Sequence, residues 1–183
     1  MTRASATGFL AGVAMAFAVA AVVVDGCDNV PSMSMDDACL KASTSQPLLR
    51  LCHSELLNAP DSDEVTVYAV ISAKSAQWAY EASSQAATGL LGNASLAGDE
   101  RAAYEACVAR YASARTRVMA VQSQLLECSY ASPKQELIHA RVDVEACGGE
   151  LSRFTASPLY AINADDQLKA TLAYELTGLI IGK

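Results

Sequence analysis

Residues 104–125, YEACVARYASARTRVMAVQSQL, decide the fold class of this chain. Their apolar residues recur at alternating steps of three and four, as Tyr104, Cys107, Tyr111, Ala114, Val118, Val121 and Leu125. This spacing places the apolar side chains on one face of an α-helix and the polar side chains on the other. The segment therefore predicts a long helix over about residues 99–129, packed against other helices through one apolar seam.

Three further segments of helical length show related patterns. The apolar residues that mark them are Val67, Ile71 and Trp78, with several alanines; Leu137, Ala140, Val144, Cys147, Leu151 and Phe154; and Leu168, Leu172, Leu176 and Leu179. They predict helices over about 63–91, 133–156 and 164–181, the last capped by Asn163 or Asp165. Residues 36–58, broken near 45–47, predict a short helical hairpin. Four amphipathic helices with short connections pack most simply as an up-and-down bundle.

Composition agrees with an all-α domain and excludes one class of partner. The chain has 183 residues, of which 52% are hydrophobic and 6% aromatic, and 35 are alanine. Alanine favours helices because it loses no side-chain entropy there. The formal net charge of −7 argues against a nucleic-acid partner, which requires a basic surface.

Residues 1–26 have the features of a secretory signal peptide. Arg3 precedes an uncharged apolar run over residues 8–24, and Val24 and Gly26 are small enough for a cleavage site. A retained membrane anchor is the alternative, because the run is slightly long for a signal. We expect removal of the signal, no stable membrane insertion afterwards, and one domain over residues 27–183 in an oxidising compartment.

Export makes the six cysteines candidates for disulfides, and no CxxC pair or zinc-finger spacing occurs. Cys39 and Cys52 lie on the two halves of the hairpin, so a bond between them would close it. Cys107 and Cys147 occupy seam positions of adjacent predicted helices, which favours a second bond. Six cysteines allow many pairings, and this choice is guided by helix geometry alone. Cys27 and Cys128 remain: they pair with each other, or Cys27 stays unpaired or is lost with the signal.

The chain resembles the plant invertase and pectin methylesterase inhibitor family over about residues 36–181. The matching features are the secretory leader, Ala38-Cys39, Leu51-Cys52, Ala106-Cys107, Tyr111, Cys147, Phe154, Ser157-Pro158 and the apolar end Leu179-Ile180-Ile181. The resemblance implies a helical hairpin on a four-helix bundle. It also implies a protein that is not itself an enzyme and that blocks a carbohydrate-active enzyme by binding over its active site.

Three details favour acid invertase over pectin methylesterase as the target. Cell-wall invertase inhibitors look to carry a Pro-Lys-Phe motif, which Pro133 and Lys134 match while Gln135 replaces the phenylalanine. Residues 157–163 are similar to a Ser-Pro-Phe-Ser-Ala-Leu-Asn segment of the same inhibitors. Lys134 also lies in a first helical turn, where the macrodipole disfavours a cation. We therefore expect Pro133, Lys134 and Gln135 to contact the target in a 1:1 complex.

The same residues have a purely structural interpretation. Ser132, Pro133 and Gln135 follow the order of a capping box, in which the serine and glutamine side chains satisfy the first backbone amides of a helix. Lys134 would then be an ordinary exposed side chain. The sequence leaves both interpretations open.

Several other residues carry expectations. Asn93-Ala94-Ser95 is a glycosylation sequon in a glycine-rich loop. Trp78, Tyr104 and Tyr111 are expected in the core, and His53 and His139 at the surface. Gly148 and Gly149 interrupt a predicted helix and indicate either a kink or a close approach of a neighbour.

No nucleophile elbow, phosphate-binding loop or zinc-protease motif is present, so we expect no catalytic residues, metal or cofactor. The alternatives to an invertase inhibitor are a pectin methylesterase inhibitor and a helical carrier that inhibits nothing. We expect the protein in the cell wall space, with the vacuole as a second possibility.

Overall fold

The computed structural model describes residues 27–60 and 64–182, and it is all-helical over them. The expected signal peptide, residues 1–26, lies outside the described residues. The helices are α1 (Met35–Ala42), α2 (Gln46–Glu55), α3 (Val65–Leu91), α4 (Gly98–Leu126), α5 (Pro133–Leu151) and α6 (Pro158–Ile181). No helix among these residues is both long and apolar enough to cross a membrane.

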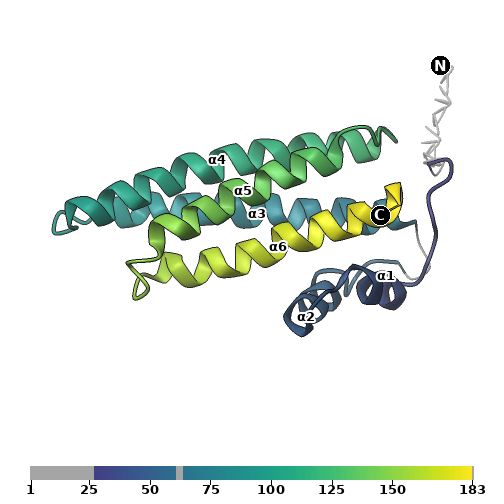
Figure 1. The fold of residues 1–183 in the computed structure, drawn as a ribbon, viewed down its shortest axis with the longest axis horizontal. Helices are drawn as coiled ribbons and strands as arrows, with labels where there is room; N and C mark the ends of the chain where they lie inside the picture. Colours follow the sequence, from purple (N-terminus) through teal and green to yellow (C-terminus); the bar gives the residue numbers. More distant parts are fainter. Residues whose placement is uncertain (1–26, 61–63, 183) are drawn as a thin grey trace, which may run out of the picture.

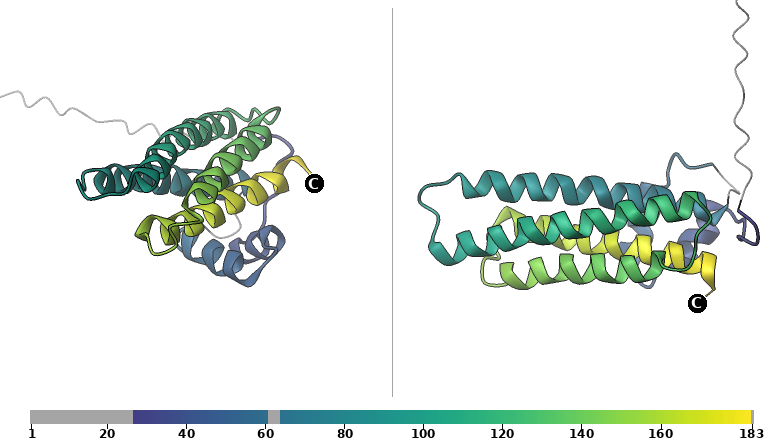
Figure 2. Two further views of the ribbon diagram at one scale, coloured as in Figure 1. Left: turned by 60° about the vertical axis from the view of Figure 1, so that its left-hand side comes forward. Right: turned by 90° about the horizontal axis from the view of Figure 1, so that it is seen from above.

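The four long helices form an up-and-down bundle. Each of these helices packs on the next one in the chain, and α6 also packs on α3 (Figures 1 and 2). The four helices therefore surround one common core. The hairpin of α1 and α2 lies outside the bundle, mainly against α6 and less against α3. The predicted architecture, a bundle with a hairpin extension, is confirmed.

The core follows the predicted seam on α4. Every seam residue from Tyr104 to Leu125 is buried. On α3 the buried positions include Ala69, Ala73, Ala76 and Ala87, so much of the interior is filled by alanine. Small side chains allow helices to approach closely, and they also bury little apolar area per residue.

Three disulfides connect the elements. Cys39–Cys52 joins α1 to α2, and Cys107–Cys147 joins α4 to α5, as expected from the sequence. Cys27 pairs with Cys128, the alternative that sequence geometry left open. This third bond ties the segment before α1 to the connection between α4 and α5.

The face of α3 differs from the prediction. Trp78, expected in the core, is 60% exposed, and its ring lies 5.1 Å from the Lys74 Nζ atom. The buried positions of α3 run through Val65, Ala69, Ser72, Ala76, Tyr80, Ser83 and Ala87. Two of these are serines, so an apolar pattern alone selects the wrong face. Tyr104 and Tyr111, by contrast, are buried as expected.

Helix boundaries also differ near residue 157. The last helix begins at Pro158, six residues before the predicted start, and the preceding helix ends at Leu151. Ser157 is the N-cap, and its Oγ accepts a hydrogen bond from the Leu159 amide at 3.2 Å. Ser-Pro is a helix start because proline lacks the amide that the first turn leaves unbonded. Asn163 is therefore buried inside α6 and caps nothing.

Gly148 lies at a close contact between α5 and α6. A Cβ atom at Gly148 would lie 2.6 Å from both Asn163 Oδ1 and Gln167 Nε2, whereas one at Gly149 would meet nothing within 4 Å. The helix α5 continues through both glycines. The sequence predicts either a kink or a close approach of a neighbour at this pair of glycines. A close approach is what the structure shows at Gly148.

Candidate functional site

The start of α5 holds the three residues expected to contact a target. Pro133 occupies the first turn and is buried, whereas Lys134 is half-buried and Gln135 is exposed. The Gln135 amide lies 2.9 Å from His139 Nε2, one turn further along the same helix. Only Lys134 and Gln135 of the three therefore present side chains that a partner can reach.

The capping box is not formed. The Ser132 side chain makes no cap bond to α5, and its Oγ instead donates to Gln124 Oε1 at 3.2 Å. The Gln135 side chain is hydrogen-bonded to His139 and not to the Ser132 backbone amide, as a capping box would require. Gln124, near the end of α4, takes the hydrogen bond of the serine hydroxyl in place of the α5 backbone. The order of residues at a helix start does not predict such a contact from another helix.

Lys134 has an intramolecular partner. Its Nζ lies 5.2 Å from the ring centroid of Tyr174 on α6, and the Arg141 guanidinium lies at the same distance from that ring. Cations within about 6 Å of an aromatic ring are attracted to its face. The Tyr174 ring thus offsets the unfavourable position of Lys134 at a helix start.

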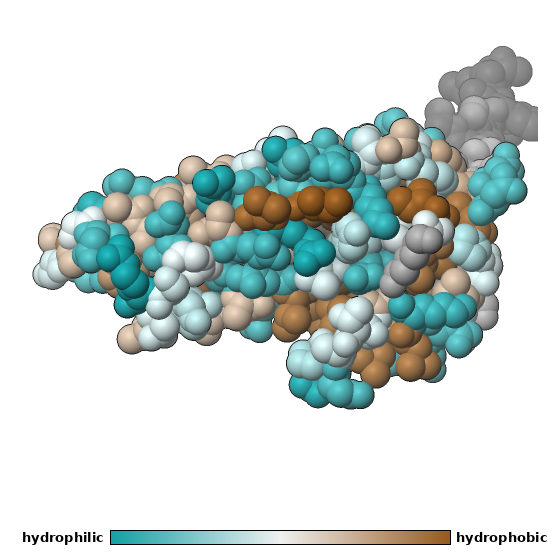
Figure 3. All heavy atoms as spheres, viewed as in Figure 1, coloured by the Kyte–Doolittle hydropathy of each residue, from teal (hydrophilic) through white to brown (hydrophobic). Residues whose placement is uncertain are grey.

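The outer face of α5 combines charge with exposed apolar groups. We call it the α5 strip, made of Lys134, Gln135, Ile138, His139 and Val142. Steps of three and four place these residues on one face. Ile138 is 36% exposed and Val142 is 54% exposed. Figure 3 looks onto α5 and α6 and shows short apolar patches set among hydrophilic side chains.

A partly exposed ionic cluster joins α5 to α4. Asp143 accepts hydrogen bonds from Arg110 at 3.2 Å and from Ser113 at 2.7 Å. Arg117 Nη1 donates to Glu136 Oε2 at 2.9 Å, and its Nε lies 3.5 Å from Asp143. Two cations and two carboxylates balance, so the cluster positions the strip without adding net charge.

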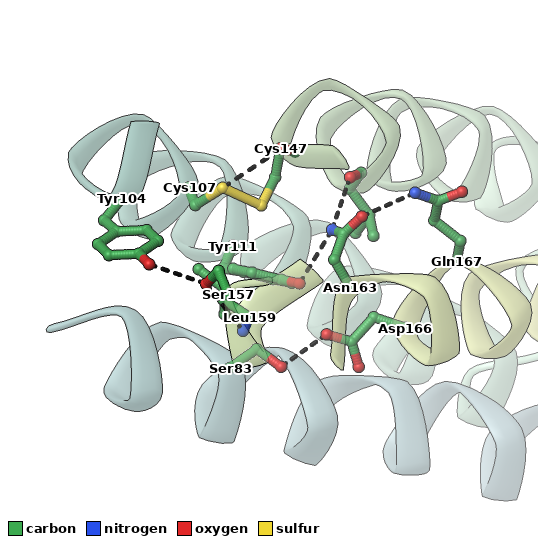
Figure 4. The surroundings of a disulfide bond; sticks show 11 residues. Ser83, Tyr104, Cys107, Tyr111, Cys147, Ser157, Leu159, Asn163, Asp166 and Gln167 are labelled. Atoms are coloured by element: carbon green, nitrogen blue, oxygen red, sulfur yellow. Dashed lines mark hydrogen bonds between the residues drawn. A yellow bond between two sulfur atoms is a disulfide. The ribbon is translucent and has the colours of Figure 1, made fainter. Parts of the chain in front are cut away.

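A buried polar network, which the sequence did not predict, crosses the bundle near the Cys107–Cys147 bond (Figure 4). Ser83 Oγ donates to Asp166 Oδ2 at 2.6 Å, from α3 to α6. Asn163 Nδ2 donates to Tyr111 at 3.0 Å and to the Val144 carbonyl at 2.9 Å. The network thereby contacts all four bundle helices.

Asp166 is the unusual member of this network, because it is a carboxyl group that is only 3% exposed. Burial raises its pKa above the ordinary aspartate value, and the Ser83 hydroxyl, Tyr111 and Lys169 act in the opposite direction by smaller amounts. The position of Asp166 between helices, with its carboxyl group hydrogen-bonded to Ser83 and Tyr111, indicates a structural role.

Nothing in the described parts of the chain suggests a metal centre, since they contain no group of three or more potential metal ligands among histidine, cysteine, aspartate and glutamate. His53 Nδ1 lies 3.4 Å from Asp36 on the hairpin, while His139 is on α5. Both histidines are at the surface in separate elements.

The two segments that resemble invertase inhibitors lie apart. Residues 133–135 are at the end of the bundle near the C-terminus, and residues 157–163 begin α6 at the other end (Figure 1). Ser157 and Asn163 are also buried. The structure therefore does not combine the two segments into one surface.

No family model matches the sequence, and no curated protein matches it. Among solved structures, the chain is similar to a crystal structure of a mutant form of a pectin methylesterase inhibitor from Arabidopsis. The TM-score is 0.70 at 14% sequence identity, and the match covers 81% of this chain and 98% of the other. At this identity the likeness shows that the two chains share a fold.

Proposed function

We propose that this chain is a secreted inhibitor that binds a pectin methylesterase in a 1:1 complex and covers its active site. The main support for this proposal is the fold, which matches a pectin methylesterase inhibitor over almost the whole length of that protein. Disulfides in the hairpin, between α4 and α5, and at the start of the described chain support a rigid surface. A rigid binder loses little conformational entropy on association.

The α5 strip is the surface that we assign to the enzyme. Ile138 and Val142 are apolar groups that remain exposed in the free protein, and the ionic cluster with α4 holds them in place. Buried apolar anchors surrounded by polar groups carry most of the binding energy in protein interfaces. The strip has this composition, with Lys134 and His139 beside the two apolar side chains.

Acid invertase is the second candidate target. Pro133 and Lys134 match the motif of cell-wall invertase inhibitors, and a glycosidase active site holds a pair of carboxyl groups that would attract a lysine. Gln135 lacks the aromatic anchor of that motif. The distance between the two invertase-like segments supports pectin methylesterase as the first choice.

Inhibition assays of the purified protein against both enzymes at mildly acidic pH test the proposal. We expect it to slow demethylation of pectin and to co-elute with the esterase at equal molar amounts. Inhibition of sucrose hydrolysis alone would transfer the assignment to acid invertase. Inhibition of neither enzyme would reject an inhibitory function and leave a helical carrier.

A pair of charge insertions tests the surface. Val142→Glu places a charge in the strip, whereas Leu57→Glu places one at a residue that is 72% exposed outside the bundle. Both sites are exposed, so both variants should fold. Val142→Glu should weaken inhibition by about tenfold or more, the effect of losing about 1.4 kcal/mol. Equal inhibition by both variants would move the interface away from α5.

We also propose export of the chain through a cleaved signal in residues 1–26 to the cell wall space, with the vacuole as the alternative destination. The three disulfides support an oxidising compartment. N-terminal sequencing of the protein recovered from medium should begin at Cys27. Recovery in membranes with residues 1–26 intact would favour a retained anchor.

A further inference from the structure

A hollow of about 540 Å³ lies at the end of the bundle where loops 92–97 and 152–157 meet. Its lining includes Asn93, Glu100, Tyr104, Arg153 and Phe154. This volume falls in the range of about 300–1,000 Å³ that is usual for small-ligand pockets. The lining mixes aromatic rings with charged and hydroxyl groups, which is the composition that a sugar ring requires.

The polar groups of the hollow are held in place. The Tyr104 hydroxyl donates to Glu100 Oε1 at 2.6 Å and lies 2.8 Å from Ser157 Oγ. The Arg153 guanidinium lies 5.7 Å from the ring centroid of Phe154. Phe154 is only half-buried, so one part of its ring is available to a ligand.

Asn93, the acceptor of the sequon, is itself part of this lining. Its Oδ1 accepts a hydrogen bond from the Ser95 amide at 3.0 Å, so the amide nitrogen is the group left for substitution. Arg101 fixes the loop by donating to the carbonyls of Leu91 at 2.9 Å and Asn93 at 3.0 Å. A group attached to Asn93 would therefore start at a defined point on the rim.

We propose that Asn93 carries an N-linked glycan whose first sugar residues pack into this hollow against Phe154 and Arg153. The apolar face of an N-acetylglucosamine ring fits an aromatic side chain, and its acetamido group offers hydrogen-bonding partners to Arg153 and Glu100. Attachment joins Asn93 Nδ2 to C1 of a lipid-pyrophosphate-linked oligosaccharide. The C1–phosphate bond breaks, and the lipid pyrophosphate and an amide proton are released.

This inference rests on the proposed export of the protein, because N-glycans are added in the secretory pathway. It does not depend on which enzyme the protein inhibits. The hollow lies at the end of the bundle opposite the start of α5 and the C-terminus (Figure 1). A glycan there would cover the loops 92–97 and 152–157. It would leave the first turns of the α5 strip open.

The test uses the full chain produced in a eukaryotic secretory host. Mass analysis of peptides should find a hexosamine-based glycan on Asn93, and an unmodified Asn93 would overturn the proposal. Ser95→Ala removes the sequon while keeping the backbone amide that bonds to Asn93. Amide hydrogen exchange over residues 152–157 should be severalfold slower in the glycosylated protein than in Ser95→Ala, because the sugar shields a loop that it does not join.

A double-mutant cycle distinguishes packing from simple attachment. Phe154→Ala should lower the melting temperature more in the glycosylated chain than in the Ser95→Ala background, because only the former loses a ring–sugar contact. A glycan that projects into solvent would give equal exchange and no coupling, which contradicts the proposal. Inhibition of pectin methylesterase, measured on the same samples, should be unaffected by Ser95→Ala, so failure of either proposal is visible separately.

Discussion

Lys134 shows how a residue can be stabilised within the fold and still serve at a surface. Its ammonium group and the Arg141 guanidinium share the Tyr174 ring, yet the side chain is only half-buried. A cation–π contact at an exposed site contributes about 0.5–1 kcal/mol. The position of Lys134 on the helix dipole is therefore not sufficient evidence for target binding, and a functional comparison is needed.

Lys74 provides that comparison, because its Nζ lies 5.1 Å from the Trp78 ring on α3, away from the strip. Lys134→Ala and Lys74→Ala should each lower the free energy of unfolding by about 0.5–1 kcal/mol. Only Lys134→Ala should weaken inhibition of the target enzyme. The loss should be about tenfold, as expected for a side chain that contributes strongly to an interface. Inhibition constants and urea denaturation of both variants give the answer, and equal inhibition constants would assign Lys134 to stability alone.

The glycine pair on α5 gives a second prediction for single residues. Gly149→Ala should stabilise the protein by about 0.5–1 kcal/mol, because alanine has the better helix propensity and its Cβ would meet nothing within 4 Å. Gly148→Ala should destabilise by about 1–3 kcal/mol, since its Cβ would overlap Asn163, which is held by two hydrogen bonds. Thermal unfolding compares the pair, and stabilisation by both would contradict the close packing of α5 on α6.

At the level of elements, Asp166 joins α6 to α3 through Ser83 and lies near Tyr111 of α4. No ion pair to Asp166 is present among the described residues, and the charged groups that act on its pKa are Lys169, which lowers it, and Asp165, which raises it, both on the same helix. Desolvation is therefore the largest effect on the pKa of Asp166, and this one carboxyl group is hydrogen-bonded to side chains of two other helices.

The raised pKa of Asp166 determines the direction of the pH dependence. The folded state holds the proton more tightly than the unfolded chain, whose aspartates titrate near about 3.9. The stability that Asp166 contributes is present in full below that pH and is lost as pH rises through the folded pKa. The contribution of Asp166 to stability should thus fall as pH rises above about 3.9, and Asp166→Asn should remove this part of the pH dependence of the free energy of unfolding. A slope unchanged in Asp166→Asn would assign the dependence to other groups.

At the scale of the whole molecule, much of the architecture can be read from the sequence. The seam from Tyr104 to Leu125 needs only helical spacing. Helix geometry also guided the choice of Cys39–Cys52 and Cys107–Cys147 among the many possible pairings, and both bonds are present. The prediction fails where polar residues occupy core positions, as with Asp166, or where a large aromatic residue is outside, as with Trp78. Hydrophobic periodicity cannot detect either case, because it assumes that burial follows polarity.

The candidate site is less predictable than the fold. Lys134 and Gln135 were expected at a surface, but the Tyr174 ring beneath Lys134 comes from α6, and nothing in the local sequence relates the two. The apolar part of the strip, Ile138 and Val142, was not predicted as exposed. Both depend on how α5 packs against the neighbouring helices of the bundle.

The disulfide between Cys27 and Cys128 gives a prediction for the molecule as a whole. It spans 101 positions of sequence, more than either of the other two. In the chain-entropy model a loop of this length contributes about 4–5 kcal/mol through the unfolded state. Replacing both cysteines by alanine should lower the free energy of unfolding by about that amount while far-ultraviolet circular dichroism stays helical. A loss below about 1 kcal/mol would show that the unfolded chain is already compact.

The alanine-lined seam has a thermal consequence. Unfolding raises heat capacity chiefly by exposing apolar surface, typically about 12–15 cal/mol/K per residue. Interior positions such as Ala69, Ala73 and Ala76 expose little hydrocarbon when the helices separate. Scanning calorimetry should therefore give a value below that range and a broad, shallow stability curve. Such a protein would tolerate wide swings of temperature in its surroundings, including cold, with little change in the population that is folded.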